Sequence, residues 1–79
     1  MNIEVTYYGL IADKVGTRKE QLSIEKEGDL SALKSALETK YADLKGFVYK
    51  VALGDELIDD SAIIYENAKI ALLPPYAGG

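Results

Sequence analysis

The chain has 79 residues, a formal net charge of −4, 48% hydrophobic residues and neither histidine nor cysteine. A chain of this length is expected to fold as one domain, residues 1–79, around a single core, and it has no apolar run of the roughly 20 residues that a membrane span needs. The missing side chains exclude a disulfide framework, a thiolate metal site and a histidine base, and the negative charge argues against nucleic acid and favours a basic protein partner. Because Met1–Glu4 does not begin a secretion signal, we expect a cytoplasmic protein.

Two strands and a short connecting segment are predicted before residue 25. Residues 3–8 and residues 19–24 each alternate apolar and polar side chains, which is typical of half-buried strands. We expect these strands to pair, and residues 9–16 between them to form a short helix or a wide loop that Gly16 ends in the left-handed conformation. The side chains predicted to face the core are Ile3, Val5, Tyr7, Leu22 and Ile24.

One long helix is predicted after Asp29. The Asp29 carboxylate can accept hydrogen bonds from the free N–H groups of the first turn and meets the positive end of the helix dipole. Apolar residues then recur at spacings of three and four, which predicts a helix that covers one face of a sheet. On its exposed side, Lys34 and Glu38 are four residues apart and can pair. The apolar stripe consists of Leu30, Leu33, Leu37 and Tyr41.

A hairpin is predicted in the middle of the chain. Residues 47–53 have the composition of a strand, residues 54–56 that of a turn, and residues 57–58 that of a short returning strand. The following residues 59–61, Asp-Asp-Ser, are interpreted as a solvated turn or a helix cap, because they lack the alternating acidic residues of a calcium loop.

The last predicted strand, residues 70–73, is apolar throughout, which indicates a place near the middle of the sheet with both faces buried. Residues 63–65 are expected to return the chain to the core before it. The order of strand, strand, helix, strand, short strand and strand predicts an α+β domain with a mixed sheet packed on one main helix.

The chain ends in Pro74-Pro75-Tyr76-Ala77-Gly78-Gly79. Neither proline can donate a hydrogen bond, so the pair is expected to end the strand and begin an extended stem. Residues 76–79 can project by about 13 Å at about 3.3 Å per residue, and the glycines lack the Cβ atoms that would obstruct a narrow channel. The pattern predicts a flexible tail whose reactive group is the Gly79 carboxylate, activated through acyl adenylation by ATP. A frayed terminus or an artificial extension is the alternative.

These features together carry a family resemblance. The opening residues 3–10, the Val15-Gly16 break, the helix capped by Asp29 and above all residues 72–79 resemble the small subunit of molybdopterin synthase, MoaD, in the MoaD/ThiS family of ubiquitin-like sulfur carriers. The resemblance covers essentially the whole chain and implies a ubiquitin-like β-grasp domain with residues 74–79 as its extended tail. Two prolines followed by two residues and Gly-Gly are characteristic of MoaD, whereas the thiamine carrier ThiS usually lacks the prolines.

The resemblance implies that Gly79 carries the chemistry. A MoeB-like adenylating enzyme, akin to ubiquitin-activating enzymes, would use ATP to convert the Gly79 carboxylate into an acyl adenylate, and a sulfur donor protein would displace AMP to leave a thiocarboxylate. The tail would then enter the large synthase subunit, MoaE, where sulfur passes to cyclic pyranopterin monophosphate. The chain would thus be a non-catalytic subunit of a hetero-oligomer, with no permanently bound cofactor or metal. The residues implied to bind the partner's channel are Pro74, Pro75, Tyr76, Ala77 and Gly78.

Three positions depart from the pattern of the family. Tyr76 stands where a small or β-branched aliphatic residue is common, Ala12-Asp13 where a basic and acidic pair is common, and Asn67-Ala68 where a Gly-Asp turn is common. Asn67 can still adopt the left-handed conformation that such a turn requires.

Other functions stay open on the residues alone. A ubiquitin-like modifier would join Gly79 to lysines of other proteins, other carriers would serve thiamine, cysteine or tRNA thiolation, and a plain interaction domain would have an inert tail. For a carrier, we expect the exposed face of the final strands to contact the partner, since exposed apolar surface beside a functional tail often marks an interface.

Overall fold

The structure is a computed structural model, and it describes residues 1–25 and 28–75. Its elements in chain order are β1 (Asn2–Tyr7), α1 (Leu10–Val15), β2 (Lys19–Ser23), β3 (Gly28–Asp29), α2 (Leu30–Lys40), the short 3-10 helix η1 (Ala42–Leu44), β4 (Lys50–Leu53), β5 (Glu56–Ile58), β6 (Ile63–Ile64) and β7 (Lys69–Leu73).

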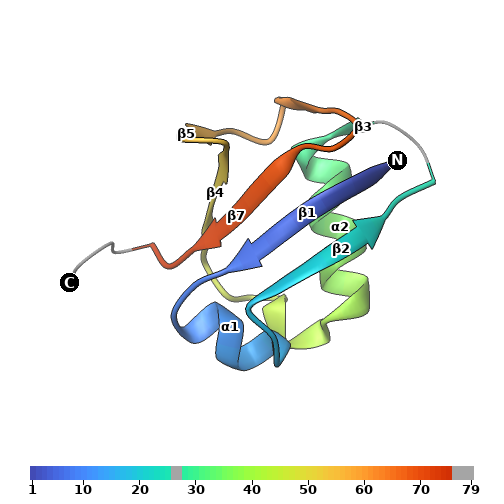
Figure 1. The fold of residues 1–79 in the computed structure, drawn as a ribbon. Coiled ribbons are helices and arrows are strands. Elements are labelled where there is room, and N and C mark those ends of the chain that lie inside the picture. The colour runs from blue at the N-terminus through green and yellow to red at the C-terminus, as the bar shows by residue number, and fades with distance from the viewer. Residues whose placement is uncertain (26–27, 76–79) are drawn as a thin grey trace.

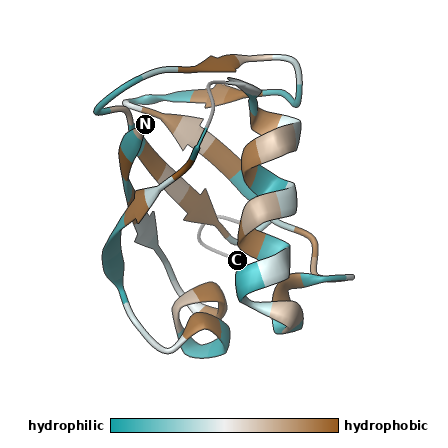
Figure 2. Ribbon diagram, turned by 90° about the vertical axis from the view of Figure 1, so that its right-hand side faces the viewer, coloured by the Kyte–Doolittle hydropathy of each residue, from teal (hydrophilic) through white to brown (hydrophobic). Residues whose placement is uncertain are grey.

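The main sheet has five strands in the order β2-β1-β7-β4-β5. Strands β1 and β7 run parallel at its centre, and the other neighbouring pairs are antiparallel. Helix α2 crosses one face of this sheet, and no described element covers the other face, which we call the open face (Figure 1). Figure 2 shows hydrophobic stretches along both the strands and α2, and the buried core takes side chains from both layers. The predicted mixed sheet on one main helix is confirmed.

Strand β1 shows why this sequence forms a sheet with one buried face. Ile3, Val5 and Tyr7 alternate with polar residues, and each is at most 2% exposed. Burying a large apolar side chain contributes roughly 1.5–3 kcal/mol, so the alternation fixes which face of β1 meets α2. In the antiparallel register with β2, Leu22 lies opposite Ile3, and Glu20 lies opposite Val5. The predicted pairing of the first two strands is confirmed. The register also places the Glu20 carboxylate on the core side of β2, which is an edge strand.

Residues 9–16 form the short helix α1 rather than a wide loop. Ile11 is fully buried and anchors α1 at the end of the core. Gly16 ends the helix in the left-handed conformation with φ 89, as predicted.

Helix α2 begins at the predicted cap. The Asp29 carboxylate accepts a hydrogen bond from the Ala32 N–H at 3.0 Å, which satisfies one of the free donors of the first turn. Leu30, Leu33 and Leu37 are buried within the core shared with the sheet, so the apolar stripe packs as the spacing predicts.

The polar side of α2 differs from the prediction. Lys34 Nζ lies 3.1 Å from Asp60 Oδ1 rather than pairing with Glu38, and Glu38 accepts a hydrogen bond from the Tyr49 hydroxyl at 2.8 Å. Both partners come from the chain around β4 and β5, and a lysine before a glutamate is the weaker order for a pair within one helix. Tyr41, the last member of the predicted stripe, follows the helix and is half-buried.

Strand β4 is shorter than the predicted strand of residues 47–53. It begins at Lys50, opposite Leu73 of β7. The ladder does not extend further because Leu73 is followed by Pro74, which has no N–H to donate. Residues 47–49 instead connect η1 to β4, so a strand there was a wrong prediction. The predicted hairpin is confirmed, since β4 and β5 pair antiparallel.

Strand β7 lies between β1 and β4, at the centre of the sheet, as predicted. Its Ile70 and Leu72 face α2 and are buried, whereas Ala71 and Leu73 are half-buried on the open face. Burial on both faces was therefore a wrong prediction, because α2 covers only one of them. The apolar continuity of β7 leaves an apolar strip on the open face beside the start of the tail.

The chain between β5 and β7 forms a separate small sheet. Ile63 and Ile64 make β6, which pairs with β3 rather than with the main sheet. Ile64 is buried and Ile63 is 65% exposed, so the predicted return to the core holds for Ile64 alone. Asn67 then adopts φ 64, which confirms its expected left-handed conformation, and its N–H donates to the Asn2 carbonyl at 2.7 Å.

Candidate functional site

The structure places the beginning of the predicted site. Pro74 and Pro75 follow β7 directly and are both half-buried. Tyr76, Ala77, Gly78 and Gly79 lie outside the described residues. The structure therefore shows how the sheet holds Pro74 and Pro75, which we call the root of the tail.

The root of the tail lies where β1 and β7 separate. The parallel register pairs Tyr7 with Leu72, and the Tyr8 N–H donates to the Leu72 carbonyl at 3.1 Å. The next residue on β1's side is Gly9, and a Cβ built on it would lie 3.1 Å from Pro74 Cγ. The Pro74 ring thus occupies the space over Gly9. Sequence reasoning did not single out Gly9, although a glycine directly after a strand was the available signal.

A wide depression of about 660 Å³ lies beside this junction, on the side of β1 and α1. It contains the Ala12-Asp13 pair, with Ala12 half-buried and Asp13 exposed on α1. Its shape offers a partner a concave surface beside the root of the tail. The lining residues are Thr6, Tyr7, Tyr8, Gly9, Leu10, Ala12, Asp13 and Arg18.

The open face combines small apolar residues with lysines. The register aligns Ala71 of β7 with Ala52 of β4 and Leu57 of β5 across this face, and Leu57 is 60% exposed. Small residues at the centre let a partner's surface approach closely.

The charges on the open face have the opposite sign to the whole chain. By register, Lys19, Lys50 and Lys69 lie on this face and are exposed, whereas Glu4 is its acidic residue on β1, 3.9 Å from Lys19. The chain's net charge of −4 predicts a basic partner. The face beside the tail instead suits an acidic one.

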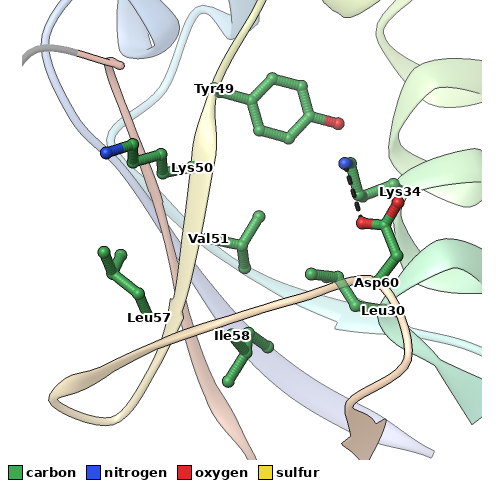
Figure 3. A pocket seen from close by; sticks show the side chains of 8 residues that line it. All are labelled: Leu30, Lys34, Tyr49, Lys50, Val51, Leu57, Ile58 and Asp60. Atoms are coloured by element: carbon green, nitrogen blue, oxygen red, sulfur yellow. Dashed lines mark hydrogen bonds and ion pairs between the residues drawn. The ribbon is translucent and has the colours of Figure 1, made fainter.

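A second hollow of about 300 Å³ lies between α2 and the β4–β5 hairpin. Figure 3 shows Tyr49 and Val51 pointing toward α2 and Lys50 and Leu57 pointing away from it. Burial and the adjacent Glu38 carboxylate raise the pKa of the Tyr49 hydroxyl well above its usual range. The lining residues are Leu30, Lys34, Tyr49, Lys50, Val51, Leu57, Ile58 and Asp60.

This hollow has the character of a packing groove. The Lys34–Asp60 ion pair crosses it, and the lysine also lies 5.3 Å from the centre of the Tyr49 ring. The charges of Lys34 and Asp60 thus compensate each other, and Lys50 is the remaining charged residue of the lining. Across residues 1–25 and 28–75, no three acidic side chains gather into a possible metal site.

A polar cluster around Glu20 joins β2 to the end of α2. The Glu20 carboxylate accepts a hydrogen bond from the Tyr41 hydroxyl and lies 3.1 Å from Lys40 Nζ. Burial tends to raise the pKa of Glu20, but the hydrogen bonds from Tyr41 and Lys40 outweigh it, so the pKa is lowered. The Tyr7 ring meets the Tyr41 ring edge-on at 6.1 Å. Sequence reasoning missed this cluster, although the alternation of residues 19–24 places Glu20 on the same side as Leu22.

The helices in the described part of the chain are all too short or too polar to cross a membrane.

Comparison with known proteins identifies the family. The model of the ThiS family matches residues 5–79. The chain is similar to SAMP1 from Haloferax volcanii, with 18% identity over 100% of both chains and a TM-score of 0.85. It is also similar to a putative molybdopterin converting factor, subunit 1, from Pyrococcus furiosus, with 12% identity over 96% of this chain and 99% of that one and a TM-score of 0.89.

A third similar structure is a protein–protein complex of subunits 1 and 2 of the molybdopterin-converting factor from Helicobacter pylori 26695. The match has 29% identity over 100% of both chains and a TM-score of 0.69. The structural neighbours confirm the ubiquitin-like β-grasp fold, and the family match confirms the resemblance inferred from the tail. The chain therefore belongs to the ThiS family.

Proposed function

We propose that this protein is the sulfur-carrier subunit of molybdopterin synthase, in which the Gly79 carboxylate is thiocarboxylated and delivers sulfur to cyclic pyranopterin monophosphate. The observation that supports this most is that a central strand is followed directly by Pro74-Pro75, and that only two residues separate these prolines from Gly78-Gly79. A strand held on both sides gives the tail a fixed origin. The tail residues Tyr76, Ala77 and Gly78 would occupy the partner's channel.

The chemistry needs no catalytic side chain from this chain. A Gly79 carboxylate oxygen attacks the α-phosphate of ATP on an adenylating enzyme, and pyrophosphate leaves. A persulfide on a donor protein then attacks the acyl carbon, and AMP leaves. A thiol of the partner proteins attacks the resulting acyl disulfide, which releases the thiocarboxylate and leaves a disulfide on the partner side. Transfer of that sulfur to the pterin precursor returns the carboxylate. Acids, bases and ATP-binding groups belong to the partners, which agrees with the absence of histidine and cysteine here.

The expected partner is a MoaE-like large subunit. The similar Helicobacter pylori chain is a subunit of a two-protein complex, which supports a hetero-oligomer for this chain as well. The open face lies beside the root of the tail, so a subunit that receives the tail can also contact this face.

Purified protein from its native cell tests the proposal. Intact-mass analysis should reveal a species in which one oxygen is replaced by sulfur, and this species should turn over the pterin precursor when it is combined with a MoaE-like subunit. Sulfur-free protein that also fails to bind the large subunit would contradict the proposal.

A ubiquitin-like modifier is the second candidate. It is supported by the similarity to small archaeal modifier protein 1 of Haloferax volcanii. Isopeptide links between Gly79 and lysines of other proteins, found by mass spectrometry of tryptic digests, would favour this function over sulfur transfer to a pterin. A carrier for thiamine, cysteine or tRNA thiolation would form the thiocarboxylate but would not support turnover of the pterin precursor.

Charge reversal on the open face should weaken the complex with the large subunit. Lys50→Glu and Lys69→Glu each place a negative charge on the face that we expect to meet acidic groups, so the Kd should rise roughly tenfold or more. Lys45→Glu makes the same change on an exposed residue outside the sheet and is the matched control. Isothermal titration at low and high salt should show the effect shrinking as salt rises. Equal Kd values for all three variants would exclude this face from the complex.

A further inference from the structure

Gly9 combines two constraints that no other described glycine combines. Its φ of 58 and ψ of −135 belong to a region that residues with a Cβ rarely adopt. A Cβ built there would also lie 3.1 Å from Pro74 Cγ and 3.9 Å from Pro74 Cδ. Gly16, Gly46 and Gly54 share the positive φ, but a Cβ on any of them meets nothing within 4 Å. Glycine is therefore required at position 9 for two reasons: its backbone conformation and the close approach of Pro74.

Both sides of this contact are held in place. On one side, the Ala12 N–H donates to the Gly9 carbonyl at 3.1 Å, which ties Gly9 to helix α1. On the other side, Pro74 follows the rung in which the Leu72 carbonyl accepts from the Tyr8 N–H. The proline ring is closed onto its own backbone, so it cannot rotate away as a flexible side chain can. A larger residue at position 9 must displace the path of the chain at Pro74.

We propose that Gly9 is a positioning residue that sets the direction in which Pro74 and Pro75 leave the sheet. The inference rests on the proposed function, because direction matters when a partner must receive the carboxyl end at a fixed catalytic centre. A misplacement of about 1 Å can cost on the order of a hundredfold in rate. Gly9 touches no reacting atom and acts through Pro74.

The kinetic test compares Gly9→Ala with Gly16→Ala in the full chain. Both put a methyl group on a residue with positive φ, so both carry backbone strain, but only the first meets Pro74. With the adenylating enzyme and ATP, kcat/KM for activation should fall roughly tenfold or more further in Gly9→Ala than in Gly16→Ala. Removing the proline ring as well, in Gly9→Ala/Pro74→Ala, should bring kcat/KM back toward that of Pro74→Ala alone, because only the loss caused by backbone strain then remains.

An NMR measurement tests the same contact without any enzyme. The wild type should show cross-relaxation between Gly9 Hα and Pro74 Hγ protons, and the residual dipolar coupling of the Leu73 N–H should change in Gly9→Ala but stay near its wild-type value in Gly16→Ala. An unchanged Leu73 coupling in Gly9→Ala, or equal kcat/KM for the two glycine variants, would overturn the positioning role. If the enzyme does not activate the wild type at all, the proposed function fails, and the NMR comparison alone decides the role of Gly9.

Discussion

Deleting Gly79 should abolish the thiocarboxylate formation that we propose for this protein and should leave the domain folded. The deletion moves the terminal carboxylate back by about 3.3 Å, and a partner that holds the tail by its backbone then presents the wrong atom to ATP. Since reacting groups must lie within about 0.5 Å of their productive positions, the activated species should fall below detection. Intact-mass analysis after incubation with the adenylating enzyme, ATP and a sulfur donor measures this loss.

The unfolding temperature is the control for this deletion. The buried apolar side chains of the described residues end at Leu72, so loss of Gly79 should leave the midpoint within about 1 °C of the wild type. Adding one alanine after Gly79 moves the carboxylate in the opposite direction and should be equally inactive. A thiocarboxylate formed normally on either altered end would show that activation does not depend on the position of the carboxylate. That result would contradict the carrier proposal.

Replacing Glu20 by glutamine should lower the free energy of unfolding by about 1.5 kcal/mol at neutral pH. Glutamine keeps the shape but removes the charge that strengthens the hydrogen bonds from Tyr41 and Lys40. Glu4→Gln is the matched control, since Glu4 lies on the open face and its nearest cation, Lys19, is 3.9 Å away. Urea unfolding followed by circular dichroism gives both values, and we expect the Glu4→Gln effect to stay below about 0.5 kcal/mol.

The pH dependence of the Glu20 effect has a definite sign. The folded-state pKa of Glu20 is lowered by its hydrogen bonds, so the folded protein binds a proton there less readily than the unfolded chain. The stabilisation is therefore fully present above the unfolded pKa of about 4.3 and is lost as pH falls through the folded pKa. The difference between wild type and Glu20→Gln should shrink between about pH 5 and pH 3. A difference that stays constant over this range would contradict the assignment of the stabilisation to the charge.

Local patterns predicted the elements whose structure depends on local spacing. The alternation in β1 and the Asp29 cap of α2 each rest on residues a few positions apart, and both appear as expected. The place of β7 at the centre also followed from its apolar run. The family resemblance then identified the fold that these elements form as a ubiquitin-like β-grasp.

The wrong predictions share a dependence on distant partners. Residues 47–49 have strand composition, but the length of β4 is set by Pro74, which directly follows the neighbouring strand β7. The second face of β7 is open because the chain supplies a cover for one side of the sheet only. The role of Glu20 depends on α2, which brings Lys40, 20 residues later in the chain, into contact with its carboxylate. The tail was recognised by its composition, whereas Gly9, which contacts its root, shows its role only once Pro74 is placed beside it.

The parallel pairing of β1 with β7 has a consequence for biosynthesis. These strands stand near opposite ends of the chain, and β7 joins the β1–β2 ribbon to the β4–β5 hairpin. Because β7 follows all the other strands of the main sheet in the chain, the central gap cannot be filled until β7 has left the ribosome. Contacts between distant segments also form late because closing a long loop is slow. A chain that stops before β7 therefore lacks the strand that completes the core, and under the proposed function it also lacks the carboxylate that an adenylating enzyme would use.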